Sequence, residues 1–474
     1  MVTSNKILKI FLLLKKRESR NRVLSLAQSI IWVCAYLVVM RYVVQAEGLE
    51  GVGIWSMTVG FVSFVRLMDL SGASGLARML ATKQNDPSEQ AYYVDTMSLF
   101  IFSLYGVLCA FSYLPLAYFL NDSVSPNQWP QTQVLLIWAL AALPLNVLGI
   151  AHLSAIDGIG RADIRSLVNI LGVGLFSIIS LALIEQAGLV GLACAQFAQF
   201  TATLLAARLV LVKQIKNFKF FPSKISLGAA KACIGYGLHL QLMSMPMALF
   251  DPLTRILVGR WAGLETLGVY DLSYKLAGHT RTLIQAYLSP LIPQFATQWI
   301  HSRGAARARF KSINEPTLRI VAAAFGTLVL FSPVASMFLL SEISAVFIFS
   351  TTAIALAWGL ASLALPTHLL ARAAGLLRWS IWGQFVILGL GPALVYWAVH
   401  QAGQVWVAIG VAVAIFIGHG IAYLGETRLL QISPIGFSDG RLEPITARSL
   451  VAFILLSILV LCLSAAIIVS SSTS

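Results

Sequence analysis

Charged side chains at helical spacing stand inside segments that are otherwise apolar. Asp251 and Arg255 are four positions apart, and Asp271, Lys275 and His279 follow at intervals of four. Because residues four apart lie on one face of a helix, each set predicts a polar stripe. Inserting a charge at the centre of a membrane helix costs about 2.5–3.5 kcal/mol of free energy, so each stripe is expected to have a structural or functional role. The stripes are candidates for binding a charged substrate, and the structural alternative is ion pairs that join two helices.

Two arginines are candidates for binding phosphate. Arg66 stands three positions before Asp69, and Arg281 is found 215 positions after Arg66. The planar guanidinium group donates two parallel hydrogen bonds to phosphate and keeps its charge in a membrane. Arg66 and Arg281 could therefore hold a diphosphate, with Asp69 limiting the charge, whereas the alternative is a structural Arg66–Asp69 ion pair. At 100° per residue Arg281 lies about 200° around the helix from His279, so the two side chains cannot face the same water.

Three carboxylates, Asp69, Asp251 and Asp271, are candidates for coupling to an ion gradient. The chain has no Gly-x-x-x-x-Gly-Lys-[Ser/Thr] motif, which excludes nucleotide hydrolysis by a P-loop mechanism. Its five cysteines have no paired spacing and no histidine in ligand register, so neither a zinc site nor a disulfide framework is predicted. We therefore expect no catalytic residue, metal or cofactor. Single histidines are interpreted as packing or hydrogen-bonding residues: His152, His368 and His419.

The composition places these residues in a membrane protein. Of 474 residues, 58% are hydrophobic and 11% are charged, and the mean hydropathy is +0.82. That balance is too apolar for a soluble protein of this length. Apolar runs of roughly 20 residues recur along the chain, which is the length needed to cross about 30 Å of hydrocarbon. The runs are continuous instead of alternating, so we predict a helical bundle and not a β-barrel.

The apolar runs predict about thirteen membrane-spanning helices. A short basic segment, residues 1–21, precedes them and is interpreted as an amphipathic cytoplasmic lead-in. The predicted helices cover residues 22–44, 52–78, 92–120, 132–154, 166–184, 188–210, 234–259, 267–296, 317–340, 344–371, 377–399, 403–424 and 448–470.

Lysine and arginine gather in alternate connectors, which explains the formal net charge of +14 without a nucleic-acid partner. Basic loops face the cytoplasm by the positive-inside rule. This alternation predicts an inner-membrane protein whose N-terminus is cytoplasmic and whose C-terminus faces outward. All the outward connectors are short, so no sizeable soluble domain is expected.

An internal repeat relates the two halves of the chain. Gly48-Leu49-Glu50-x-x-Gly53 recurs as Gly263-Leu264-Glu265-x-x-Gly268, an offset of 215. The same offset places Gly160 on Gly375 and Gln186-Ala187-Gly188 on Gln401-Ala402-Gly403. It therefore maps helices one to six onto helices seven to twelve. Because six is even, both copies enter the membrane from the same side and the repeat is parallel.

This register predicts the organisation of the chain. Two like bundles can enclose a cavity and expose it to either side of the membrane by rocking, which is transport architecture. The charged stripes occur only in the second copy, so we expect the second lobe to hold most of the substrate's charge. The predicted parts are a cytoplasmic N-tail (1–21), an N-lobe (22–212), a basic cytoplasmic linker (213–233), a C-lobe (234–425), a cytoplasmic loop (426–447) and an extra helix with the tail (448–474).

Several motifs carry a family resemblance over residues 22–425. They are the repeated Gly-Leu-Glu-x-x-Gly motif, Leu67-Met68-Asp69-Leu70-Ser71-Gly72-Ala73-Ser74 followed by Arg78, Gly158-Ile159-Gly160-Arg161, and Pro290-Leu291-Ile292-Pro293. Together they resemble the polysaccharide and O-antigen flippases of the multidrug/oligosaccharidyl-lipid/polysaccharide exporter superfamily. The thirteenth helix is a departure, since such flippases usually carry twelve or fourteen.

The resemblance implies two six-helix lobes around a V-shaped, often cationic cavity, the MATE-like fold. It implies a flippase, not an enzyme, that moves a polyprenyl-diphosphate-linked oligosaccharide across the inner membrane during surface-polysaccharide assembly. The implied partners are that lipid-linked substrate, membrane lipids and polysaccharide assembly machinery, with no nucleic acid or nucleotide.

Three alternative functions stay open at this point. A drug or cation antiporter of the same fold would require unpaired acids in the cavity, whereas every mid-membrane acid is predicted to have a basic residue within four positions. A peptidoglycan-precursor flippase would differ only in substrate. A membrane-embedded polysaccharide polymerase or ligase would require a large outer loop, and none is predicted.

Overall fold

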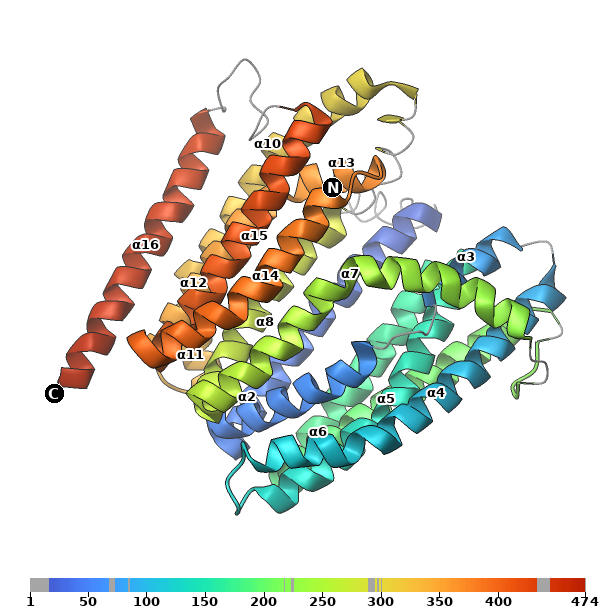
Figure 1. Ribbon diagram of the computed structural model, residues 1–474, viewed down its shortest axis with the longest axis horizontal. Helices are drawn as coiled ribbons and strands as arrows, with labels where there is room; N and C mark the ends of the chain where they lie inside the picture. Colours follow the sequence, from blue (N-terminus) through green and yellow to red (C-terminus); the bar gives the residue numbers. More distant parts are fainter. Residues whose placement is uncertain are drawn as a thin grey trace, which may run out of the picture. The chain divides into compact units, whose positions relative to one another are not determined.

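The computed structural model describes residues 17–67, 73–83, 86–216, 218–222, 226–288, 295, 298–299, 301–432 and 444–473. Every regular element within these residues is a helix (Figure 1). In hydrocarbon a helix satisfies its backbone hydrogen bonds within its own segment, so long apolar runs fold this way. The predicted all-α fold class is confirmed.

Six described helices precede the turn at Gly263, and the last of them begins the second copy of the repeat. They are α2 (Arg17–Leu67), α3 (Ala73–Thr82), α4 (Pro87–Asn121), α5 (Trp129–Gly158), α6 (Ala162–Gln214) and α7 (Leu227–Ala262). The helices that follow are α8 (Leu264–Leu288), α10 (Arg303–Leu330), α11 (Ser332–Leu340), α12 (Ala345–Leu363), α13 (Leu365–Ala373), α14 (Arg378–Trp397), the short η1 (Ala398–Ala402) and η2 (Gln404–Trp406), α15 (Val407–Leu430) and α16 (Pro444–Thr473).

The internal repeat is visible in the backbone itself. Among the described residues, all six glycines with positive φ form three pairs with an offset of 215: Gly48 with Gly263, Gly160 with Gly375, and Gly188 with Gly403. Glycine adopts positive φ at no steric cost, so it marks the places where a helix must reverse. The two copies therefore turn at equivalent positions, as the sequence register predicts.

One of these turns is the same helix cap in both copies. The Arg161 amide donates to the Ile156 carbonyl at 3.0 Å, and the Leu376 amide donates to the Ala371 carbonyl at 2.9 Å. In each case the hydrogen bond passes around a left-handed glycine, which is the Schellman motif. Identical capping explains why this loop kept its register through the repeat.

Two helices are too long for one membrane crossing. α2 has 51 residues and α6 has 53, and each is interrupted by a glycine with non-helical backbone angles, Gly48 and Gly188 respectively. The predicted connectors there are thus single-glycine turns instead of loops. Among the described residues, nine helices are long and apolar enough to cross a membrane. The predicted count of thirteen crossings stays a prediction.

Two long helices are missing from those nine, and both carry the charged stripes. α7 and α8 have 36 and 25 residues, respectively, but their sequences include Asp251, Arg255, Asp271 and Lys275. α7 also contains Pro246 and Pro252. Proline removes a backbone donor and kinks a helix, so α7 combines charge with an irregular backbone.

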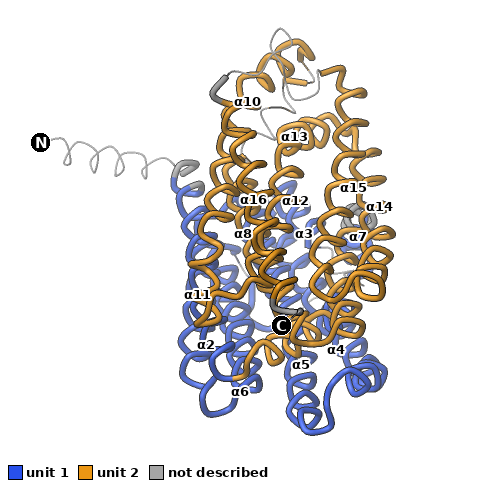
Figure 2. The backbone as a smooth tube through the Cα atoms, turned by 90° about the vertical axis from the view of Figure 1, so that its left-hand side faces the viewer, with its two compact units in different colours: residues 1–46, 61–245 blue, residues 47–60, 246–474 orange. Residues whose placement is uncertain are grey.

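The described chain forms two compact units, coloured separately in Figure 2. Unit 1 comprises residues 1–46 and 61–245, and unit 2 comprises residues 47–60 and 246–474. The boundary within α7 falls at Pro246, the first of its two prolines. In unit 1, α5 packs against α3, α4 and α6. In unit 2, α12 packs against α8, α10, α15 and α16, so it is the central helix of that unit.

Several helix ends differ from the prediction. α15 continues to Leu430, so the predicted loop at 426–447 begins with helical residues. Leu430 is fully buried and packs with Phe310 and Leu370, which holds the last turn in place although its sequence, Glu426-Thr427-Arg428, is polar. α7 starts at Leu227, within the predicted linker 213–233. Burial against other helices, which a linear hydropathy pattern does not contain, sets these ends.

Candidate functional site

The two charged stripes of unit 2 come together in one buried ion-pair cluster. The Arg255 guanidinium lies 2.9 Å from the Asp251 carboxylate and 3.3 Å from the Asp271 carboxylate. The Lys275 ammonium group lies 2.7 Å from the other Asp271 oxygen. Asp271 is completely buried, whereas the Asp251 side chain is 35% exposed. α7 and α8 are thus joined by charges, as the structural alternative described.

The cluster balances its own charge. It contains two carboxylates and two cations, and each cation has a carboxylate partner within 3.3 Å. Buried ions are expensive to desolvate unless they are paired in this way. In this arrangement the four residues do not present a net positive charge to an anion. Their predicted role in substrate binding therefore requires that at least one pair open.

Arg281 is not a member of this cluster, and the contacts of its guanidinium group are with neutral groups. Its guanidinium carbon lies 4.1 Å from the centre of the Trp358 ring, and its Nη2 atom lies 3.3 Å from His419 Nε2. Among the described residues no carboxylate is within ion-pair distance of it, and its buried Nε has no hydrogen-bond partner. Stacking on tryptophan stabilises a cation without neutralising it. Arg281 therefore retains a full positive charge and a spare donor.

The other predicted site residues have different positions. His279 lies one helical turn beyond Lys275 on α8 and is partly buried. Arg66 is exposed in the last turn of α2 and belongs to unit 1, and its backbone carbonyl accepts a hydrogen bond from the Tyr105 hydroxyl at 3.4 Å. Asp69 lies outside the described residues. The matched roles of Arg66 and Arg281 stay a prediction.

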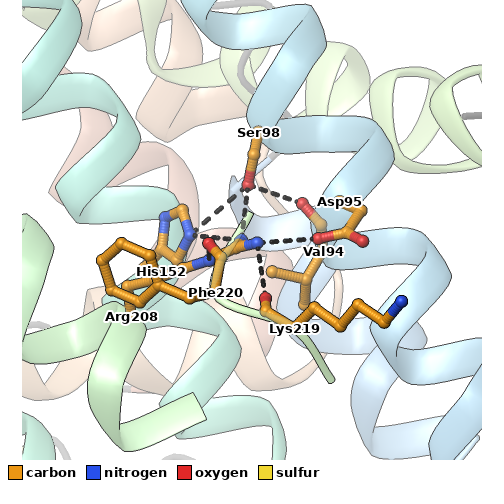
Figure 3. A network of polar contacts seen from close by, with 7 residues as sticks. All are labelled: Val94, Asp95, Ser98, His152, Arg208, Lys219 and Phe220. Carbon is orange, nitrogen blue, oxygen red and sulfur yellow. Dashed lines mark hydrogen bonds and ion pairs between the residues drawn. The ribbon is translucent and has the colours of Figure 1, made fainter. Parts of the chain in front are cut away.

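Unit 1 contains a buried network of hydrogen bonds and an ion pair that the sequence does not predict (Figure 3). The Arg208 guanidinium, on α6, lies 2.8 Å from the Asp95 carboxylate on α4, and both side chains are less than 10% exposed. Asp95 has no basic residue within four positions along the chain, so local spacing does not indicate its partner. Its partner is 113 positions away, on a different helix.

The same guanidinium also binds the segment that leads to the second copy. Arg208 donates to the carbonyls of Lys219 and Phe220 at 3.0 and 2.9 Å (Figure 3). Its guanidinium carbon also lies 4.2 Å from the centre of the Phe218 ring. The five donors of arginine make this multiple engagement possible. Residues 218–220 are thereby fixed to the last turns of α6.

A second missed cluster lies in unit 2, near the end of α15. Glu426 is fully buried, and its two carboxylate oxygens contact His368 Nδ1 on α13 and the Ser380 hydroxyl on α14. His368 in turn faces His419, with 6.0 Å between the ring centres. The interpretation of these histidines as hydrogen-bonding residues agrees with these contacts. The sequence predicts a loop from residue 426 onward, so it does not indicate a buried carboxylate at this position.

A cavity of about 420 Å³ opens beside the start of α10, in the same unit. Two cationic side chains reach it, and one of them, Arg307, also donates to the Leu430 carbonyl at 3.1 Å. The lining residues are Gly304, Arg307, Ala308, Phe310, Lys311, Gln431 and Ile432. The lining of this cavity is therefore positively charged, because it includes Arg307 and Lys311.

The sequence matches a family model described as "polysaccharide biosynthesis protein" over residues 51–346. Among curated proteins, none matches the chain. The matched region begins just before Gly53 of the repeated Gly-Leu-Glu-x-x-Gly motif and ends in α12. It therefore includes the Arg208 network, the four-residue ion-pair cluster and Arg281.

Solved structures of transporters share the fold. An inward-facing multidrug resistance MATE family transporter of the MOP superfamily aligns with a TM-score of 0.72 at 14% identity, covering 85% of this chain and 98% of that one. The lipid II flippase MurJ, in an inward closed conformation, aligns with a TM-score of 0.61 at 12% identity, covering 96% and 99%. A MOP superfamily transporter from Pyrococcus furiosus Vc1 (DSM3638), described with a binding pocket of reverse polarity, gives 0.60 at 15% identity, covering 89% and 98%.

These comparisons establish the fold and the broad class. The predicted MATE-like helical fold is confirmed, and so is the resemblance to the multidrug/oligosaccharidyl-lipid/polysaccharide exporter superfamily. The neighbours are transporters and flippases, not enzymes. Together with the nine long apolar helices found in the described parts of the chain, they identify a multi-pass membrane protein.

Proposed function

The chain belongs to the polysaccharide biosynthesis protein family, and from this premise we propose that it is a flippase for a polyprenyl-diphosphate-linked oligosaccharide. In this proposal the substrate carries an O-antigen or exopolysaccharide unit and crosses the inner membrane by alternating access. The transporter fold and the likeness to a lipid II flippase support movement of a lipid-linked molecule. The N-terminus is then cytoplasmic, as the distribution of basic loops predicts.

The observation that carries the proposal is the state of Arg281. Its contacts are an aromatic ring and a neutral imidazole, and neither of these groups neutralises its positive charge. A diphosphate has the charge and the acceptor geometry that a guanidinium group recognises best. We assign Arg281 the role of binding the diphosphate, and Arg66, the repeat-equivalent residue, is proposed to share it.

The cluster of Asp251, Arg255, Asp271 and Lys275 has a different part in this proposal. Because its charges are balanced, it does not attract the substrate in the arrangement described. The partly exposed Asp251 is the member that can most easily leave its partner. Opening of that pair would release Arg255 toward the diphosphate, with His279 contributing a further polar contact. Asp69, Asp251 and Asp271 remain the proposed ion-coupling candidates.

The proposal is tested by substrate binding and by transport in vesicles. Arg281→Ala, Arg281→Lys and the control Arg372→Ala, an exposed arginine at the end of α13, are purified in detergent and compared with the wild-type protein. A hydrogen bond to a charged group contributes about 1.5–3 kcal/mol, so Arg281→Ala should weaken binding of the diphosphate-linked substrate roughly 10- to 100-fold. Arg281→Lys should recover part of this loss and Arg372→Ala should show none.

The same assay separates the rival functions. A neutral lipid-linked sugar that lacks the diphosphate should bind equally to all variants if Arg281 acts on phosphate. Equal binding of the diphosphate substrate by the wild-type protein and Arg281→Ala would contradict the assigned role. Preferential transport of an organic cation would instead identify an antiporter, and preferential transport of a peptidoglycan precursor would identify the related flippase.

Arg66 is tested in cells. Arg66→Ala should reduce surface polysaccharide while the protein remains in the membrane at its normal level. Wild-type polysaccharide in both Arg66→Ala and Arg281→Ala would rule out the shared diphosphate site. Partners in polysaccharide assembly are part of the proposal, and copurification with them would be an additional result.

A further inference from the structure

The first turns of α10 carry positive charge that the described part of the chain does not balance. Four cations stand between residues 303 and 311, and no residue of the first helical turn is acidic. The cations are Arg303, Arg307, Arg309 and Lys311. Among the described residues, no carboxylate lies within ion-pair distance of any of them. A helix N-terminus itself favours anions, because its free amide groups and its dipole present positive charge. An anion would therefore stabilise this end of α10.

One face of these turns lines the cavity beside the start of α10. Four of the lining residues lie at helical spacing on that face: Gly304, Arg307, Ala308 and Lys311. Both charged residues of the lining are thus on the same face, and among the described residues the lining contains no acid. The small size of glycine and alanine leaves space beside the two cations. The cavity volume of about 420 Å³ lies within the roughly 300–1,000 Å³ that is typical of small-molecule sites.

The end of α15 forms another part of the lining and orients Arg307. Arg307 Nε donates to the Leu430 carbonyl at 3.1 Å, and its Nη2 atom donates to Gln431 Oε1 at 3.0 Å. Leu430 is fully buried and packs with Phe310 of α10, so the two helices are fixed together at this point. A guanidinium group has five N–H donors, and these hydrogen bonds use two of them. Arg307 is thus held in place with donors left for a ligand.

Gln431 adopts a backbone conformation that glycine normally occupies. It ends α15 with a φ of 52°, in the left-handed region, and the Ile432 amide donates to the Thr427 carbonyl at 3.1 Å. This is the Schellman cap that the repeat forms elsewhere with glycine. A side chain at this position introduces steric strain that glycine avoids. Glutamine supplies what glycine lacks, an amide oxygen that accepts from Arg307. The strained residue therefore positions a cationic group of the cavity lining.

We propose that this cavity binds a phosphate group. Arg307 offers planar N–H donors that match phosphate oxygens, and Lys311 adds a second positive charge on the same helix face. The phosphate comes from one of two sources, which are the headgroup of an anionic lipid in the surrounding membrane and a phosphate ester dissolved at the membrane surface. The site involves neither Arg281 nor the ion-pair cluster, so it does not depend on the function proposed for those residues.

The positive-inside rule explains why this segment is basic, because the sequence predicts residues 297–316 as a cytoplasmic connector. It does not explain the cavity or the two hydrogen bonds that orient Arg307. Arg309 distinguishes the two explanations. It is exposed, lies two positions from both Arg307 and Lys311, and is absent from the cavity lining. Under the rule alone Arg309 and Arg307 are equivalent, whereas a phosphate site requires only Arg307.

The site is tested by the protection of Lys311 from chemical modification. The full-length protein is reconstituted in phosphatidylcholine nanodiscs and treated with an amine-reactive reagent in the presence of glycerol 3-phosphate, and mass spectrometry measures the modification of each lysine. A second preparation contains equal parts of phosphatidylcholine and phosphatidylglycerol without the soluble ester. Lys213, an exposed lysine in the last turn of α6, is the internal control. We expect Lys311 to be modified several-fold more slowly in at least one of these conditions, and Lys213 to be unaffected.

The two conditions identify the source of the phosphate. Protection by glycerol 3-phosphate in neutral lipid supports a dissolved ester, protection by phosphatidylglycerol alone supports a lipid headgroup, and protection by both shows that the site accepts either. Unchanged modification of Lys311 in both conditions would overturn the inference. Equal protection of Lys311 and Lys213 would also overturn it, because that pattern reflects the general charge of the surface.

Two matched variants locate the protection. Arg307→Gln should raise the amount of glycerol 3-phosphate or phosphatidylglycerol needed for half-protection of Lys311 roughly 10-fold, because a charged hydrogen-bond donor is lost. Arg309→Gln removes the same charge from an exposed position of the same helix, and it should change that amount less than about 2-fold because exposed charges are screened. Equal effects of the two changes would contradict a site at the cavity.

Gly304 provides a second test that leaves both cations in place. Gly304→Glu introduces a carboxylate at the cavity, and an acid in the first turn stabilises a helix, so this variant should fold and lose the protection. Gly304→Ala is the control, because a Cβ atom there would meet only the Ser302 Oγ atom, at 3.8 Å. It should keep the protection. Protection that persists in Gly304→Glu would exclude the phosphate site even if Arg307→Gln does not fold.

Discussion

Gly53 and Gly268 occupy equivalent positions in the two copies of the repeat, and each lies against the backbone of the other copy's motif. A Cβ atom on Gly53 would be 2.0 Å from the Leu264 carbonyl oxygen, and one on Gly268 would be 2.2 Å from the Leu49 carbonyl oxygen. Leu49 and Leu264 are themselves related by the offset of 215. The contact is therefore reciprocal, and it explains why both copies keep the Gly-Leu-Glu-x-x-Gly motif.

The first prediction concerns this reciprocal contact. Gly53→Ala and Gly268→Ala should each destabilise the protein by about 1–3 kcal/mol, because the added methyl group has no room and the backbones must separate. The measurement is thermal unfolding in detergent. Gly278→Ala, in the same helix as Gly268 but with open space around it, is the matched control. It should be neutral or slightly stabilising, and equal destabilisation by all three changes would contradict the packing argument.

A second prediction concerns the buried ion-pair cluster. Asp271→Asn should destabilise the protein by about 3–5 kcal/mol, since it leaves Arg255 and Lys275 buried with one carboxylate between them. Adding Lys275→Met should restore part of the loss, and a double-mutant cycle measures the coupling. Asp157→Asn breaks the more exposed Asp157–Arg165 pair and should cost no more than about 1 kcal/mol. Additive effects at Asp271 and Lys275 would show that the two charges do not interact.

A third prediction concerns the segment held by Arg208. Arg208→Lys keeps the charge near Asp95 but cannot reach both backbone carbonyls, so residues 218–221 should exchange their amide hydrogens faster. Loss of hydrogen bonds to a charged donor costs about 1.5–3 kcal/mol, which corresponds to roughly 10- to 100-fold faster exchange if opening of the segment limits it. The measurement is hydrogen exchange by mass spectrometry. Arg165→Lys serves as the control, and unchanged exchange in Arg208→Lys would show that other contacts hold the segment.

A fourth prediction concerns the extra helix. Phe453 of α16 is buried against α12, where a Cβ atom on Gly359 would lie 2.6 Å from the ring. Gly359→Ala should therefore weaken the docking of α16 and lower stability by about 1–3 kcal/mol. Combining it with Phe453→Leu, which shortens the side chain, should recover part of the loss. Gly389→Ala, with open space around the glycine, is the control for helix propensity, and the absence of any coupling would place α16 elsewhere.

The fold was predictable because its signals are local or periodic. Long apolar runs predict membrane helices, and the offset of 215 predicts paired turns that recur at Gly160 and Gly375 with the same cap. The failures occurred where burial overrides local pattern. The end of α15 reads as a polar loop, yet the buried Leu430 keeps it helical and brings Glu426 into the protein interior.

The candidate site was predictable only in part. Spacing by four positions identified Asp251 with Arg255 and Asp271 with Lys275, because one helix turn brings such residues together. It could not predict that Arg255 also contacts Asp271, which joins the two pairs into a neutral cluster. Nor could it predict that Arg281 would rest on Trp358 and His419, which leaves its charge unbalanced.

The sequence by itself therefore determined the class of protein, the helical architecture and the repeat, since these follow from hydropathy and from a register that is written along the chain. Tertiary structure decided which charges cancel and which do not. Asp95 contacts Arg208, which is 113 positions away, and Glu426 contacts His368, which is 58 positions away. Spacing within one helix does not predict either contact. The physical reason is that a buried charge is governed by whatever packs around it, and in a helical bundle those neighbours come from other helices.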